Sequence, residues 1–384
     1  MSDPDAHDLM PTLQAFGIED AAACLDCEND HAECPLKTAS ATANANLIRD
    51  LQAGLEDNIK QSPEPWLYRH DPDSNNVCPR GVDIDAVMAG LRRYQTSLYD
   101  QTGISQWFYT SKIFPFMAIL FIAFLVGLSF YTWHGPMLSD KVALTVFAPY
   151  SLVKTFNLII LIVLAIFLSI NLFRLFRSVM GDPGQYPELS FSEKQRFPNR
   201  LINGIPLPVY MNELKAFIGD FLPWVQLKSC KTPSQRQQYW VHLLIITGFT
   251  VIFVMAMAGL QWFQRDEICA LWRPIRLLGY YCTFAILYGV TYILIARLNK
   301  SRPAYQHTHF TDWVSLMLLW LTAFSGILIH CARLLELPLS TYYLYVIHLM
   351  IATPLLLLEI PFANGAMQLY RPVVVYLERV KRHS

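Results

Sequence analysis

Two histidines lie deep inside apolar stretches in the last third of the chain. His330 follows the run WLTAFSGILI, and His348 follows STYYLYVI. An ionisable side chain inside a lipid bilayer is energetically costly, and it marks a candidate functional site. Imidazoles that face one another from neighbouring helices are typical ligands of haem iron. The alternative is that either imidazole only hydrogen-bonds a neighbouring helix.

Two further histidines and one methionine extend this set of candidate haem ligands. His242 lies in YWVHLLIITGF, His134 follows the first long apolar run, and Met367 lies nineteen residues beyond His348. On a regular helix that separation corresponds to about 28 Å, which is enough for two stacked haems. Methionine is a competent axial ligand, although it is also an ordinary residue of bilayer helices. The best pairings are an inner site of His242 with Met367, and an outer site of His348 with His330 or His134.

Closely spaced cysteines near the N-terminus predict an iron–sulfur centre. The run CLDCENDHAECP follows the template C-x2-C-x2-C-x3-C-P with Asp30 at the third position, and a second run keeps only its last cysteine. Five side chains are therefore the candidate ligands of one [4Fe-4S] cluster: Cys24, Cys27, Asp30, Cys34 and Cys78. A zinc site that uses His31, and the absence of any metal, are the alternatives.

The composition is that of a membrane protein. Of 384 residues, 53% are hydrophobic and 16% are charged, which argues against a soluble enzyme. The formal net charge is +0, so nothing indicates a nucleic-acid partner. The first residues, MSDPDAHDLM, are acidic and lack an apolar run, so no signal peptide is predicted and the N-terminus is expected in the cytoplasm. In that compartment, closely spaced thiols favour metal ligation over disulfides.

Helices are the elements that must position these residues. Residues 47–55 and 84–98 show apolar side chains at helical spacing, and no alternation typical of strands occurs before residue 105. We predict an all-α chain. A small helical ferredoxin-like domain comprises residues 1–105, and a membrane domain with six transmembrane helices comprises residues 106–384. A domain as small as the first often relies on a metal centre for its stability.

Six apolar runs are long enough to cross the hydrocarbon of a bilayer. They extend over residues 113–133, 152–173, 239–263, 276–295, 313–334 and 342–360. Lysine and arginine gather before the first run, between the second and third, between the fourth and fifth, and after the sixth. The positive-inside rule therefore places both termini in the cytoplasm, and we expect an integral protein of the inner membrane.

The long connection between the second and third runs contains an amphipathic segment, MNELKAFIGDFLPWVQL. One side of it carries Leu214, Phe217, Ile218, Phe221 and Leu222. Such a helix lies in the headgroup region or docks onto another protein of the same complex. It could equally cover the inner surface of the bundle.

The order of these motifs is familiar. A cysteine-rich helical segment ends in Trp66-x11-CPRGVDI, W-x-H opens the third run, and GILIH-x-x-R, Y-x-x-I-H-L and LYRP follow near the end. This order resembles the QmoC-like membrane component of the quinone-interacting membrane-bound oxidoreductase complex. Members of that family fuse a heterodisulfide reductase C-like ferredoxin domain to a heterodisulfide reductase E-like domain of the nitrate reductase gamma superfamily. The resemblance covers nearly the whole chain.

The resemblance implies two cubane clusters in the soluble domain, haem b in the membrane and electron exchange with a quinone. It would pair position 242 with position 367, and position 252 with position 348. Histidine is the family residue at all four positions, whereas this chain has Ile252 and Met367. Each pair therefore retains one imidazole, His242 in one and His348 in the other.

Together these patterns predict a membrane electron-transfer subunit that is not catalytic alone. Quinone or quinol would react near haem b, and electrons would pass through the iron–sulfur cluster to or from soluble flavin- and iron–sulfur-containing partner subunits. The alternative is a redox-degenerate anchor that docks a partner complex at the bilayer and has lost some or all cofactors. A likeness of fold does not decide between them.

Overall fold

We describe the chain from a computed structural model. It covers residues 9–18, 47, 50–51, 53–68, 83–181, 201–202, 205–220, 233–266, 272–300 and 308–382. The regular structure of these residues is helical except for a two-stranded antiparallel ladder, β1 (Leu201–Ile202) with β2 (Ile205–Pro206). The predicted all-α class is confirmed.

Contacts divide the chain into two compact units. Unit 1 comprises residues 1–110, 169–229 and 365–384, and unit 2 comprises residues 111–168 and 230–364. Unit 1 includes segments from later in the chain, so these units are not the two domains expected from the sequence. The predicted domain boundary at residue 105 stays a prediction.

Helix α7 (Ile84–Tyr99) organises unit 1, and its position agrees with the predicted helix over residues 84–98. The Asp83 side chain caps its first turn by accepting a hydrogen bond from the Ala86 backbone N–H at 3.1 Å. Its apolar face repeats at helical spacing through buried Ile84, Val87, Met88 and Leu91. This face belongs to one apolar cluster with residues of α1 (Leu9–Ala15).

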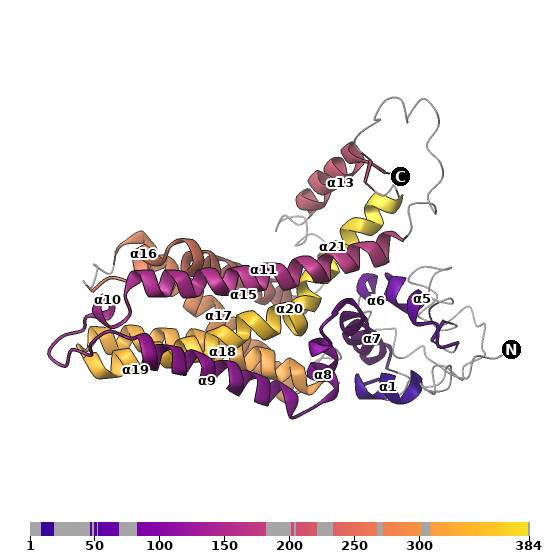
Figure 1. Cartoon of the computed structure of the whole chain (residues 1–384). Helices are drawn as coiled ribbons and strands as arrows, with labels where there is room; N and C mark the ends of the chain where they lie inside the picture. The colour runs from indigo at the N-terminus through magenta and orange to yellow at the C-terminus, as the bar shows by residue number, and fades with distance from the viewer. Residues whose placement is uncertain are drawn as a thin grey trace. The chain divides into compact units, whose positions relative to one another are not determined.

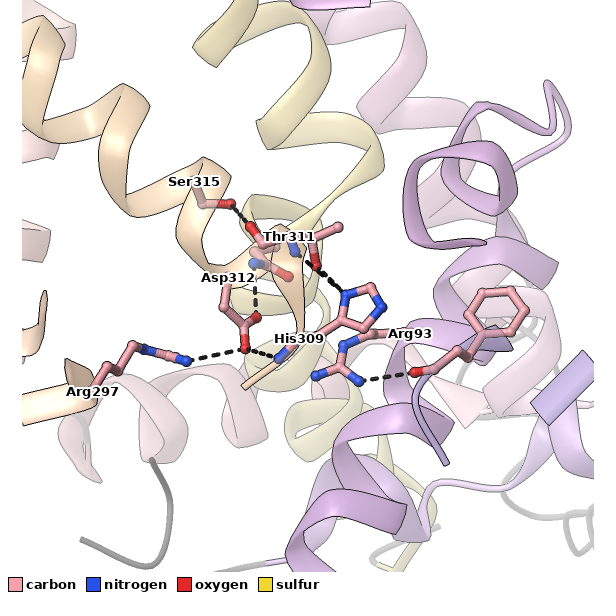
Figure 2. Close-up of polar contacts among 8 residues, drawn as sticks. Arg93, Arg297, His309, Thr311, Asp312 and Ser315 are labelled. Atoms are coloured by element: carbon pink, nitrogen blue, oxygen red, sulfur yellow. Dashed lines mark hydrogen bonds and ion pairs between the residues drawn. The ribbon is translucent and has the colours of Figure 1, made fainter. Parts of the chain in front are cut away.

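Polar side chains of α7 also bind the backbone of earlier segments. The Arg93 guanidinium donates to the Phe16 carbonyl at 2.9 Å, as Figure 2 shows. The Gln95 amide donates to the Ile59 carbonyl in α5 (Glu56–Gln61) at 2.6 Å. Because these carbonyls lie where helices end, the side chains replace the partners that the helix itself lacks there.

Two arginines that are far apart in the sequence hydrogen-bond the backbone at and just after α6 (Glu64–Leu67). Arg92 Nε donates to the Pro65 carbonyl at 2.6 Å, and Arg371 donates to the Tyr68 carbonyl at 3.0 Å. Burial, reinforced by the positive charge of Arg371, lowers the pKa of Arg92 to about 10. Arg92 therefore keeps its positive charge at neutral pH.

Aromatic rings and Met367 complete the interior of unit 1. Tyr370 of α21 (Asn364–Arg382) makes edge contacts with Trp66 at 6.0 Å and Tyr99 at 5.9 Å between ring centroids. Met367 packs against both apolar clusters of this unit. In the amphipathic connection, α13 (Leu207–Asp220) confirms a helix over its first part, and residues 221–232 lie outside the described residues.

Within the residues that the structure describes, six helices are long and apolar enough to cross a membrane, as predicted. They are α9 (Phe114–Trp133), α11 (Tyr150–Met180), α15 (Pro233–Ala258), α17 (Pro274–Leu298), α18 (Phe310–Leu334) and a last span over Pro338–Phe362. The short helices α8 (Ile104–Thr110), α10 (Leu144–Phe147) and α16 (Leu260–Phe263) lie in the chain beside them. Within unit 2, α19 (Pro338–Pro354) packs against both α18 and α9 (Figure 1).

Glycines allow α15 and α17 to approach closely. A Cβ atom at Gly248 would lie 3.1 Å from the Ala285 Cβ and 3.2 Å from the Cys282 carbonyl oxygen. A Cβ atom at Gly289 would lie 2.5 Å from Ile245 Cγ1. Small residues at such crossings are typical of membrane helices, because dispersion contacts drive their association.

The last span contains a π-helix, η5 (Leu355–Glu359), which joins α19 to α20 (Ile360–Phe362). It begins directly after Pro354, whose ring nitrogen has no hydrogen to donate to the preceding turn. The series of backbone hydrogen bonds of α19 is interrupted there, and the chain continues with the wider turns of η5. Single π-helical turns within α-helices often coincide with functional sites, and η5 ends on the carboxylic residue Glu359.

Gly248→Leu is predicted to destabilise unit 2 by overpacking the contact of α15 with α17. The free energy of unfolding should fall by about 1–3 kcal/mol, measured as a lower melting temperature of the purified chain in detergent. Gly219→Leu is the matched control, because nothing lies within 4 Å of a Cβ atom placed there. Equal destabilisation by the two variants would contradict this account of the helix crossing.

Candidate functional site

A cavity of about 420 Å³ lies among the spans of unit 2. Its lining comes chiefly from α15, α17, α18 and the last span, and most of it is apolar. The polar members gather where α17 begins and α18 ends: Gln264, Arg265, Arg276, Tyr280, His330 and Arg333. Four more polar groups lie along the wall: Thr283, Thr322, Tyr345 and His348. An apolar cavity with a few converging polar groups is the usual form of a cofactor site.

His348 of α19 lines this cavity, and α18 holds its ring in place. Its Nδ1 atom lies 2.9 Å from the Ser325 hydroxyl. Directly beside it, a Cβ atom at Gly326 would lie 3.6 Å from the imidazole Cε1. That distance is an ordinary van der Waals contact, so Gly326 packs closely beside the ring, and the serine fixes its rotation. Ser325 engages Nδ1, so Nε2 is the nitrogen available for another ligand.

His330 of α18 lines the same cavity at its polar end. Its Nε2 atom lies 2.8 Å from the Tyr280 hydroxyl and 3.2 Å from an Arg276 guanidinium nitrogen. The Tyr280 ring packs edge-on against the imidazole, with centroids 5.4 Å apart, and the Arg276 guanidinium lies 6.0 Å from the centroid of the Tyr280 ring. Arginine can only donate hydrogen bonds, so His330 Nε2 is the acceptor at this end of the cavity, and the Tyr280 hydroxyl can donate to the same atom.

The cavity brings together one of the predicted outer pairings. His330 and His348 are the two histidines in the lining formed by the described residues. His134 ends α9 instead, where its Nδ1 atom lies 2.6 Å from the Gly135 carbonyl oxygen and its ring packs on Phe147. Ile252, which stands where the family resemblance places a histidine, also lines the cavity.

The predicted inner pairing stays a prediction. The His242 side chain of α15 is exposed in the structure. Met367 belongs to unit 1, where apolar side chains surround it. These two residues belong to different units.

All candidate ligands of the iron–sulfur cluster lie outside the described residues. These are Cys24, Cys27, Asp30, Cys34 and Cys78, together with the alternative zinc ligand His31. Among the residues that the structure does describe, no group of three or more His, Cys, Asp or Glu side chains has the arrangement of a metal site. The cluster remains a prediction from spacing.

Reasoning centred on histidine overlooks a second polar group, at the end of unit 2 where α17 finishes and α18 starts. Asp312 accepts hydrogen bonds from Arg297 at 3.1 Å, from the Asn364 amide at 3.0 Å and from the His309 backbone N–H at 3.3 Å (Figure 2). One turn further along α18, Ser315 hydrogen-bonds buried Glu359. A carboxylic residue within the apolar run LLLLEIPF was the sequence signal for this group.

Comparison with known proteins supports one distant relationship. A protein of Archaeoglobus profundus, described as similar to the C subunit of heterodisulfide reductase, is 30% identical over 88 residues. The match covers 23% of this chain and 47% of that protein, so the chain matches about half the length of this relative. No family model and no solved structure matches the chain. The chain is therefore a helical protein with six candidate membrane spans and a distant likeness to the heterodisulfide reductase C type of protein.

Proposed function

We propose that the chain is the membrane-spanning electron-transfer subunit of a redox complex with several subunits. It would exchange electrons between a quinone in the bilayer and soluble flavin- and iron–sulfur-containing subunits. The observation that carries this proposal is His348, an oriented imidazole on the wall of an apolar cavity within the spans. The likeness of part of the chain to a heterodisulfide reductase subunit supports the redox class.

His348 has the properties expected of a haem ligand. Histidine ligands almost always hydrogen-bond a second group through the nitrogen that does not bind the metal. Ser325 occupies that role at Nδ1, which leaves Nε2 for iron. His330 is the second histidine of the lining and would be the second residue to hold the haem. Haem b bound there would supply one-electron chemistry, while the protein sets its potential through ligands, hydrogen bonds and burial.

The polar end of the cavity suits the head group of a quinone. Quinone carbonyl oxygens accept hydrogen bonds, and Arg276 and Tyr280 are donors in an otherwise apolar wall. These residues already hydrogen-bond His330. A quinone there would replace part of that network, so the same side chains would couple the substrate to a candidate haem ligand.

The N-terminal cysteines would carry electrons between the membrane and the soluble partners. We propose one [4Fe-4S] cluster held by Cys24, Cys27 and Cys78, with Asp30 or Cys34 as the fourth ligand. The template spacing and the heterodisulfide reductase likeness support this assignment. With this cluster, the chain would relay electrons between one-electron centres. Catalysis would require the partner subunits.

A specific observation also favours the rival function of a membrane anchor without haem. Ile252 offers no donor to the cavity, and the Nε2 atom of His330 is already engaged by Tyr280 and Arg276. In this alternative the cavity binds no iron, and His348 and His330 serve only to connect helices. The two functions differ in whether the purified chain carries redox centres.

The haem assignment predicts a b-type spectrum that depends on His348. The dithionite-reduced minus oxidised spectrum of the purified chain should contain a haem α-band. His348→Ala should abolish it, and Ser325→Ala should weaken haem retention by about 10–100-fold, as expected for loss of an outer hydrogen bond. His134→Ala is the control, because His134 is absent from the cavity lining. A folded wild-type chain without the band, or a band that survives in His348→Ala, would exclude this haem site.

The cluster assignment predicts a fixed content of iron and sulfide. The purified chain should contain roughly four non-haem iron atoms and four acid-labile sulfides, as one [4Fe-4S] cluster requires. Cys27→Ser should lower both contents together. Cys331→Ser should leave them unchanged, since Cys331 is a free, exposed cysteine at the end of α18. Iron without sulfide, or zinc in its place, would contradict the cluster.

A further inference from the structure

Glu359 is a carboxylic residue in the interior of unit 2 with no cationic partner among the described residues. Only 1% of its surface is exposed. One carboxyl oxygen is within hydrogen-bonding distance of the Ser315 hydroxyl, while Oε1 has no hydrogen-bond partner. A carboxylate is very costly in an apolar medium unless it is paired. This environment favours a neutral carboxyl group that carries a proton.

The hydrogen bonds of Ser315 are compatible with the same state. The Ser315 hydroxyl lies 3.3 Å from the Thr311 carbonyl oxygen as well as beside the Glu359 carboxyl. A hydroxyl group has one hydrogen and two lone pairs. If that hydrogen goes to Thr311, the contact with Glu359 is complete only when the carboxyl group donates its own proton. A protonated Glu359 therefore satisfies both contacts.

Asp312 lies nearby on α18 in the opposite situation. It is paired with Arg297 and accepts further hydrogen bonds from the Asn364 amide and the His309 backbone. Asp312 thus has a cationic partner, whereas Glu359 has none among the described residues. Two carboxyl groups held in such contrasting surroundings are a recurrent arrangement for proton transfer.

Asn364 is close in the chain to one of these carboxyl groups and hydrogen-bonds the other. It follows Glu359 by five residues, just beyond η5 and α20, and its amide nitrogen donates to Asp312. Its Oδ1 atom is buried without a hydrogen-bond partner, and the residue is only 9% exposed. The end of the spans therefore holds the Asp312–Arg297 ion pair and two buried oxygens without hydrogen-bond partners, Glu359 Oε1 and Asn364 Oδ1.

We propose that Glu359 is an intramembrane proton-binding site, loaded from the end of unit 2 where α18 begins by way of Asp312, whose carboxylate the Asn364 amide orients. In the loading step an O–H bond breaks in a hydronium ion at that end, and an O–H bond forms at the Glu359 carboxylate. No electron moves. The charged and titratable groups of the described residues at this end include Asp312, Arg297 and His309, Lys300 just after α17, and Arg236 and His242 near the start of α15. The residue that receives the proton, Glu359, is the last residue of η5. The proposal goes beyond the redox function and does not depend on it.

Infrared spectroscopy of the full chain in a lipid film tests this site directly. At neutral pH the wild type should show the carbonyl stretch of a protonated carboxyl group, and D₂O should shift it to lower frequency. Glu359→Gln should remove this band. Glu336→Gln, the same change at an exposed residue, should leave it in place. Carboxylate bands in place of the carbonyl band, or the same spectrum in wild type and Glu359→Gln, would overturn the proposal.

Two further variants test the hydrogen bonds and the route. Ser315→Ala should raise the frequency of the Glu359 carbonyl band, because the bond to the hydroxyl is lost. Asp312→Asn should slow deuterium exchange of that band several-fold, and Asn364→Ala serves the same purpose if Asp312→Asn does not fold. Unchanged exchange in both route variants would overturn the route. Conversion of the carbonyl band to carboxylate bands on adding Na⁺ at constant pH would show a cation site instead. None of these readouts requires haem, quinone or an electron.

Discussion

The apolar interior of the membrane bundle imposes one constraint on every polar group inside it: the group must find a partner within the protein. Helices satisfy the backbone, and side chains must satisfy one another. His348 meets this requirement with Ser325, and His330 meets it with Tyr280 and Arg276. Glu359 meets it only in part, because one of its oxygens stays without a partner. The polar groups that could do chemistry are therefore few.

Sequence patterns were sufficient for the parts of the fold that local physics determines. An apolar run of about twenty residues must be helical in hydrocarbon, so the six spans could be predicted without knowledge of their neighbours. Helix α7 could be predicted for a similar reason, since apolar spacing and the capping residue Asp83 both indicate its start. The packing of Trp66, Tyr99 and Tyr370 against one another in unit 1 could not be predicted, because no local pattern joins residues so distant in sequence.

The candidate site was predictable in its residues more than in its contacts. The cost of burying an imidazole indicated His330 and His348, and the structure places both on one cavity. Their hydrogen-bond partners depend on helix rotation and crossing, which a single sequence does not reveal. Glu359 was overlooked for another reason. It stands near the end of an apolar run, where a carboxylate can be mistaken for a boundary residue, but the π-helix continues the span and keeps it buried.

The two ends of α18 differ in the kind of polar group that they hold. Where the helix ends, His330 is surrounded by donors from Tyr280 and Arg276 beside a large apolar cavity. Where it begins, Asp312 is paired with Arg297, and Ser315 connects the helix to Glu359. A cavity with donors suits a neutral, electron-accepting ligand, whereas a buried carboxyl without a cation suits a proton. Helix α18 thus separates a candidate electron site from a candidate proton site. The neighbouring span carries both His348 and Glu359. Coupling between the two sites would need a change in hydrogen bonding along these two helices.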